Sequence, residues 1–196
     1  MMKPVLPLVA GMMLAALSSL PAQAGLFSSS EVDAEKQAVQ LARETVNGEY
    51  QLLTVQELKQ WMDEKKPLLI VDTMPFADSY KKQHIPGAVN MAFPMSDMNV
   101  WDKATMGATT QADFLRLLGT DKARTLVFYC GFVKCARSHN AALWAKKLGY
   151  QHVYRLPGGI TAWKEAGYPL EKGGTAAPTG TAQSDAAKGA TCTQGC

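Results

Sequence analysis

Two continuous apolar runs constrain the fold of this chain more than any other feature. Residues 68–71 read Leu-Leu-Ile-Val and residues 125–129 read Thr-Leu-Val-Phe-Tyr. Runs without polar alternation are typical of strands that are buried on both faces of a parallel sheet. Asp72 follows the first run and Cys130 follows the second. Ligands of parallel sheets bind beyond the carboxyl ends of the strands, so both residues are candidates for a site.

Helical segments alternate with short strands along the rest of the chain. Residues 30–48 have an amphipathic pattern that begins at Ser30, and residues 54–57 form a capping box that opens a second helix. Further strands are expected at residues 50–53, 88–89 and 152–156, and further helices at residues 111–118, 138–148 and 160–166. This alternation predicts an α/β fold with a parallel sheet and helices on both faces.

Both ends of the chain lie outside this alternation. Residues 1–24 combine Lys3, an apolar run and the sequence Ala22-Gln23-Ala24, which is the pattern of a secretory signal peptide cleaved after Ala24. We therefore expect a periplasmic or secreted protein with no stable membrane insertion after cleavage. The expected organisation is a signal peptide (1–24), an N-terminal helical extension (25–49), one domain (50–171) and a disordered tail with two cysteines (172–196).

Charge and cysteine content narrow the classes of partner. The net charge is +3 at pH 7, and no stripe of Lys and Arg side chains indicates a nucleic-acid partner. All four cysteines follow the predicted cleavage site, and export would let them pair or cycle between thiol and disulfide. Cys192 and Cys196 alone would supply only two ligands, so we predict no metal site and no cofactor.

The segment after the second apolar run carries the candidate chemistry. A loop between a buried strand and a helix can turn its N–H groups inward, and the helix adds the positive end of its dipole. We expect these donors to lower the pKa of the Cys130 thiol and make it the nucleophile. Lys134 and Arg137 would hold an oxyanion, because both are cationic donors. The candidate site residues of the loop are Cys130, Gly131, Phe132, Val133, Lys134, Cys135, Ala136 and Arg137, with Asp72 beside them.

Several motifs, taken in order, resemble the rhodanese-like family over roughly residues 50–171. They include residues 69–72, the stretch His84-Ile85-Pro86-Gly87-Ala88-Val89-Asn90, the Cys130 loop and the stretch Pro157-Gly158-Gly159-Ile160-Thr161-Ala162-Trp163. The resemblance implies a sheet of about five parallel strands flanked by helices. It also implies a sulfurtransferase in which Cys130 accepts a sulfane sulfur as a persulfide. A small-molecule sulfur donor and a thiol acceptor, including exported thiol proteins, are the implied partners.

Two departures from the family pattern leave alternatives open. Met74 stands where many single-domain sulfurtransferases have an Arg, and six residues separate Cys130 from Arg137 where the usual loop has four. The longer loop also contains Cys135, whose backbone could approach Cys130 closely enough for a disulfide. Cys135 could then attack a persulfide or mixed disulfide on Cys130 and release the other group, as a persulfide reductase would. The alternatives are a thiol-disulfide oxidoreductase or isomerase that uses Cys130 and Cys135, and a non-catalytic binding module.

Overall fold

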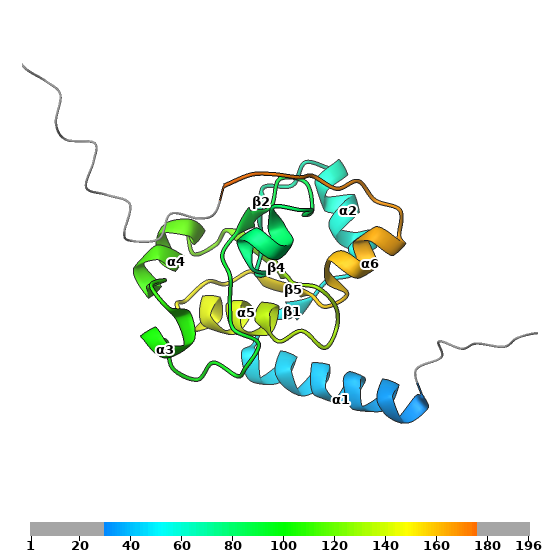
Figure 1. Cartoon of the computed structure of the whole chain (residues 1–196), viewed down its shortest axis with the longest axis horizontal. Coiled ribbons are helices and arrows are strands. Elements are labelled where there is room, and N and C mark those ends of the chain that lie inside the picture. The colour runs from blue at the N-terminus through cyan, green and yellow to red at the C-terminus, as the bar shows by residue number, and fades with distance from the viewer. Residues whose placement is uncertain (1–29, 176–196) are drawn as a thin grey trace, which may run out of the picture.

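A computed structural model of the chain describes residues 30–175 and contains a five-stranded sheet (Figure 1). The strands are β1 (Gln51–Leu52), β2 (Leu68–Asp72), β3 (Val89–Asn90), β4 (Thr125–Tyr129) and β5 (Val153–Leu156). They lie in the order β1-β5-β4-β2-β3, and each neighbouring pair is parallel. The predicted α/β fold with about five parallel strands is therefore confirmed.

The two apolar runs form neighbouring strands in the middle of the sheet. β2 and β4 pair along their whole length, with Leu68 opposite Thr125 and Asp72 opposite Tyr129. Both strands are buried from their second residue onward, as expected for strands that are covered on both faces. The chain leaves both strands at the same edge of the sheet, so Asp72 and Cys130 come to neighbouring places there.

Side-chain caps start two of the helices as the sequence predicted. The Ser30 side chain accepts a hydrogen bond from the N–H of Asp33, and Thr54 and Glu57 form the capping box. The helices are α1 (Glu31–Gly48), α2 (Val55–Asp63), α3 (Lys103–Met106), α4 (Gln111–Leu118), α5 (Arg137–Lys147) and α6 (Gly159–Glu165), with a short π-helix η1 (Phe76–Tyr80). Helix α3 was not predicted, because four residues carry too little hydrophobic periodicity to be recognised.

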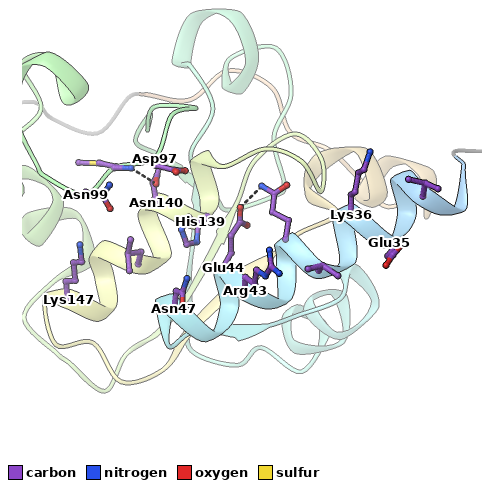
Figure 2. Close-up of a pocket in the computed structure, with 15 residues that line it drawn as sticks. Glu35, Lys36, Arg43, Glu44, Asn47, Asp97, Asn99, His139, Asn140 and Lys147 are labelled. Carbon is purple, nitrogen blue, oxygen red and sulfur yellow. Dashed lines mark hydrogen bonds between the residues drawn. The ribbon is translucent and has the colours of Figure 1, made fainter.

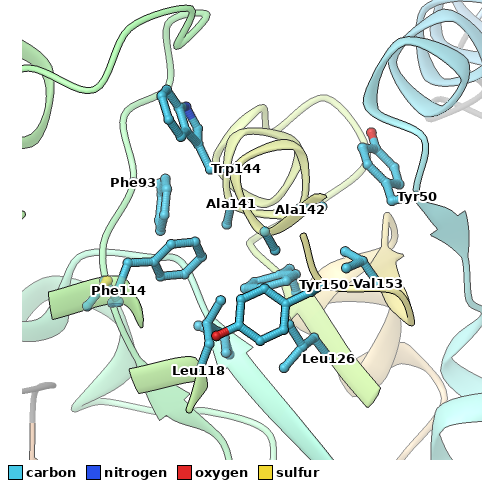
Figure 3. Packing of buried hydrophobic residues seen from close by; sticks show 14 of the residues in the cluster. Tyr50, Phe93, Phe114, Leu118, Leu126, Ala141, Ala142, Trp144, Tyr150 and Val153 are labelled. Atoms are coloured by element: carbon cyan, nitrogen blue, oxygen red, sulfur yellow. The ribbon is translucent and has the colours of Figure 1, made fainter. Parts of the chain in front are cut away.

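Two apolar clusters fill the space between the sheet and its helices. The first lies under α4 and α5 and is rich in aromatic rings, among them Phe93 and Phe114 with centroids 5.2 Å apart (Figure 3). Ala141 and Ala142 of α5 are fully buried there, and their small side chains let the helix approach the sheet closely. The second cluster lies under α2 and α6 and includes Trp163. Helices therefore cover both faces of the sheet.

Helix α1 lies along the outside of α5 (Figure 1). Neither apolar cluster of the described residues contains a side chain of α1. Instead, Glu44 of α1 forms an ion pair with Arg155 of β5. Just beyond the helix, the Tyr50 hydroxyl is hydrogen-bonded to Nδ1 of His139 at 2.8 Å. Polar contacts thus attach this helix to the rest of the fold.

Part of the expected organisation concerns residues that the structure does not describe. The signal peptide predicted for residues 1–24 and the tail cysteines Cys192 and Cys196 lie outside residues 30–175. The division into an extension, one domain and a tail stays a prediction. Within residues 30–175, no helix is both long and apolar enough to cross a membrane.

Candidate active site

The loop from Cys130 to Ala136 joins the carboxyl end of β4 to the first residue of α5. The base of this loop is fixed by α6, because the N–H of Ile160 donates to the Cys130 carbonyl at 2.9 Å and the N–H of Thr161 donates to the Gly131 carbonyl at 3.0 Å. Gly159 permits this approach. It has φ of +56°, and a Cβ atom at this position would overlap the Cys130 carbonyl group.

The loop turns back on itself so that its second cysteine lies over the first. The N–H of Cys135 donates to the Phe132 carbonyl at 3.0 Å, which closes a turn at the tip. Phe132 is 49% exposed at this tip, whereas Cys130 and Cys135 are 0% and 2% exposed. Both cysteines are free thiols. The loop therefore presents an aromatic ring to solvent and encloses its two sulfur atoms.

The Cys130 thiol contacts Cys135, and the surroundings of the two sulfur atoms differ. The Cys130 Sγ lies 3.1 Å from the Cys135 carbonyl oxygen and 3.1 Å from the Ser138 Oγ. A contact with a carbonyl oxygen requires the protonated thiol as donor. Burial, together with the hydrogen bond to Cys135, raises the pKa of the Cys130 thiol well above its ordinary value.

The lowered thiol pKa that was predicted for Cys130 is found at Cys135 instead. The hydrogen bond from the Cys130 thiol is the main cause that lowers the pKa of Cys135 to about 6. The N–H groups of Gly131 and Arg137 and the charge of Arg137 lower it further. Burial of Cys135 acts in the opposite direction and raises the pKa. The expected lowering of the Cys130 pKa was therefore wrong. The physical reason is that burial outweighs the hydroxyl and N–H of Ser138 at the Cys130 sulfur, whereas the N–H groups of Gly131 and Arg137 act on the Cys135 sulfur.

Arg155 is a site residue that the sequence analysis missed. It is 1% exposed, and its guanidinium donates to the Ser138 Oγ at 3.1 Å, the Cys135 carbonyl at 3.1 Å and the Val133 carbonyl at 3.3 Å. The same group pairs with Glu44. Arg155 of β5 therefore holds the loop through its carbonyl groups and joins it to α1. The signal was present in the sequence, since a charged residue interrupts the otherwise apolar end of β5.

Asp72 shapes the neighbouring turn after β2. One of its carboxylate oxygens accepts the N–H of Met74 at 2.8 Å, and Asn90 donates to the carbonyls of Asp72 and Met74 at 3.0 and 2.8 Å. The other oxygen, Oδ2, is buried and has no hydrogen-bond partner among the described residues. Burial raises the pKa of Asp72 to about 6. A Cβ atom on Gly131 would lie 3.8 Å from the Met74 side chain, so Met74 packs against the loop.

The two predicted cations take different places. Lys134 is exposed on the turn of the loop, whereas Arg137 is half-buried and donates to the Phe93 carbonyl. The segment that follows Phe93 covers the loop, because the Met95 sulfur lies 3.6 Å from the Cys135 Sγ. Met95 is 47% exposed, so the side chain that covers the Cys135 sulfur is itself partly open to solvent. The structure thus brings Cys130, Cys135 and Arg137 together and leaves Lys134 outside.

A separate groove of about 790 Å³ lies between α1, α5 and the segment around Asp97 (Figure 2). Its walls are mostly polar and include Glu44, Arg43, His139 and Lys147. The loop cysteines do not line it, but Glu44 reaches from its wall to Arg155. Within residues 30–175, no group of three or more His, Cys, Asp or Glu side chains is arranged to hold a metal ion.

Comparisons with known proteins agree with this architecture. Residues 54–166 match the sequence model of a family described as "Rhodanese-like domain". The thiosulfate sulfurtransferase GlpE of Shewanella oneidensis is 32% identical over 114 residues, which cover 58% of this chain and 92% of that protein. An HTH-type transcriptional regulator of Mycobacterium tuberculosis is 32% identical over 111 residues, which cover 57% of this chain but only 39% of the regulator. The crystal structure of a thiosulfate sulfurtransferase from Pseudomonas aeruginosa has the same fold, with a TM-score of 0.52 and 21% identity over 71% of this chain and 23% of that chain.

Proposed function

Because the chain belongs to the family of rhodanese-like domains, we propose that it is a sulfurtransferase that carries a sulfane sulfur as a persulfide on Cys130. One observation carries the proposal. Cys130 lies at the carboxyl end of a buried parallel strand, in a loop at the N-terminus of α5, with the Ser138 hydroxyl 3.1 Å from its sulfur. Ligands of parallel sheets bind at this end of the strands, and the positive end of the helix dipole favours the Cys130 thiolate that forms once the buried thiol has lost its proton.

The transfer takes place in two steps. Cys130 attacks the sulfane sulfur of a donor such as thiosulfate, the sulfur–sulfur bond of the donor breaks, and sulfite leaves with the bonding electron pair. The Cys130 proton passes along its hydrogen bond to Cys135, whose lower pKa leaves it in the thiolate form that can accept a proton. An acceptor thiol, or cyanide, then takes the outer sulfur and regenerates Cys130. The loop from Gly131 to Ala136 carries the transferred group, with the Phe132 and Lys134 side chains outside it, and Arg137 supplies positive charge.

We place this activity outside the cytosol, because the pattern of residues 1–24 is that of a cleaved signal peptide. The partners are then a small sulfane-sulfur donor and an acceptor that is either a small thiol or an exported thiol protein. Mass spectrometry of the protein isolated from the periplasm or the medium tests this location. A mature chain that begins at Gly25 supports it, and an intact N-terminus at Met1 or Met2 contradicts it.

The activity is tested with thiosulfate and cyanide as substrates and thiocyanate as the measured product. We expect Cys130→Ser to lower the rate by about a thousandfold or more, because it removes the nucleophile. Intact-protein mass spectrometry after thiosulfate treatment should find one added sulfur atom on Cys130. Sulfur transfer that survives Cys130→Ser would overturn the proposal, and a wild-type protein without any transfer would favour a binding module.

A further inference from the structure

The second cysteine of the loop is not needed to form a persulfide on the first. A sulfurtransferase that cycles through one persulfide requires one nucleophilic sulfur and an external acceptor. Here a second cysteine lies against that sulfur inside the same loop, with its carbonyl oxygen 3.1 Å from the Cys130 Sγ. Both thiols are buried, so an external acceptor has to compete with a neighbour that is already in place.

The loop is built to keep the two sulfur atoms together. The turn closed by the Cys135 N–H and the Phe132 carbonyl folds the chain back over Cys130. The Arg155 guanidinium donates to the Cys135 carbonyl oxygen at 3.1 Å. The Cys130 Sγ lies 3.1 Å from that same carbonyl oxygen. The amides of Gly131 and Arg137 face the Cys135 sulfur and favour its thiolate form. The Cys135 thiolate and the Cys130 sulfur that it would attack are thus held by hydrogen bonds within one loop.

We propose that Cys135 is a resolving cysteine, which attacks the Cys130 persulfide, closes an internal Cys130–Cys135 disulfide and releases hydrosulfide. This step rests on the proposed function, because it requires a persulfide on Cys130. It would make the protein a persulfide reductase when no external acceptor takes the sulfur first. The site then has two products, a transferred sulfur or a released sulfide, and the available acceptor decides between them.

The atoms and electrons of this step balance. The proton that Cys135 accepted from Cys130 passes to the outer sulfur of the persulfide, and the restored Cys135 thiolate then attacks the Sγ of Cys130. A bond forms between the two cysteine sulfurs while the bond to the outer sulfur breaks, and the outer sulfur leaves as hydrosulfide with the electron pair and its own proton. The cysteine pair is oxidised and the sulfane sulfur is reduced. An external thiol or dithiol must then reduce the disulfide before the next cycle, and the half-exposed Met95 lies on the side from which it can approach Cys135.

The test uses thiosulfate as donor, without cyanide and without oxygen. The starting protein carries Cys192→Ser and Cys196→Ser, so that the tail cysteines cannot resolve the persulfide. We expect this protein to release one equivalent of sulfide and to stop until dithiothreitol is added. Peptide mapping without reduction should find Cys130 linked to Cys135. In the same background, Cys135→Ser should take up sulfur more slowly, because Cys135 no longer accepts the Cys130 proton, but it should retain the added sulfur on Cys130. Its rate of sulfide release per Cys130 persulfide should be lower by about tenfold or more.

The outcomes separate this inference from the proposed function. A stable Cys130 persulfide in both the starting protein and the Cys135→Ser variant would overturn the resolving role and leave the sulfurtransferase intact. Release of sulfide by the Cys135→Ser variant at the rate of the starting protein would also overturn it. If neither protein takes up sulfur while circular dichroism shows both to be folded, the Cys130 persulfide itself is wrong and both proposals fall. A sample incubated without thiosulfate is the control. Its Cys130 and Cys135 must stay reduced, because a disulfide between them in that sample would come from another oxidant.

Discussion

At the scale of single residues, the charge of the site is located on Cys135 and not on Cys130. The hydrogen bond from the Cys130 thiol is the strongest influence that lowers the pKa of Cys135 to about 6. We therefore expect alkylation of Cys135 by a small reagent to accelerate with a midpoint near pH 6. Replacement by Cys130→Ala should move this midpoint upward, because it removes the donor. Ser138→Ala is the matched control, because it removes a contact of the Cys130 sulfur but keeps the Cys130 thiol as donor. The midpoint for Cys135 should therefore stay near pH 6 in this variant. A wild-type midpoint at the ordinary cysteine value would contradict this assignment.

Asp72 provides a second residue-scale prediction, about stability. Its pKa is raised from 3.8 to about 6 by burial, so the folded state favours the protonated form. The stability linked to this proton is present below pH 4 and is lost as the pH rises through 6. Asp72→Asn should therefore increase the free energy of unfolding by about 1–2 kcal/mol at pH 8 and change it little at pH 4. Urea denaturation at both pH values measures this, and an equal effect at both would show that the carboxylate charge is not the cause.

At the scale of elements, the contact between α6 and the Cys130 loop explains why a glycine begins that helix. Gly159→Ala should destabilise the protein by about 2–4 kcal/mol, because the new Cβ meets the Cys130 carbonyl and the positive φ is strained. Gly149→Ala is the matched control. Gly149 has φ of +89°, and a Cβ atom added there would have nothing within 4 Å, so its cost should be about 1 kcal/mol. Thermal unfolding measures both variants, and equal losses would show that the close approach is unimportant.

The elements themselves were largely predictable, whereas the contacts that complete the site were not. Local signals identified β2 and β4 as apolar runs, α1 by its amphipathic pattern and α2 by its capping box. The helix α3 is too short to leave such a pattern. The partners of Arg155 come from α1, the loop and α5, and only the folded chain brings these distant segments together. The position of Cys135 likewise depends on how the longer loop turns, which no residue pattern specifies.

At the scale of the whole molecule, Arg155 connects the outer helix, the sheet and the active-site loop. Its partners are Glu44 of α1 on one side and the Val133 and Cys135 carbonyls of the loop on the other. A buried ion pair of this kind is costly to break on one side only, because the remaining charge keeps its desolvation penalty without its partner. The residue thus has two separable effects, one on stability through Glu44 and one on activity through the loop.

The two effects of Arg155 can be separated by a double variant. Arg155→Met should lower the free energy of unfolding by about 2–4 kcal/mol, because it leaves the Glu44 carboxylate without its partner. Adding Glu44→Leu should restore most of this stability, since both charges are then absent. Sulfur transfer should stay about tenfold or more below wild type in the double variant, because the donors that hold the loop carbonyls are still missing. Urea denaturation and thiocyanate formation measure the two effects on the same protein. Recovery of both together would show that Arg155 acts through charge balance alone.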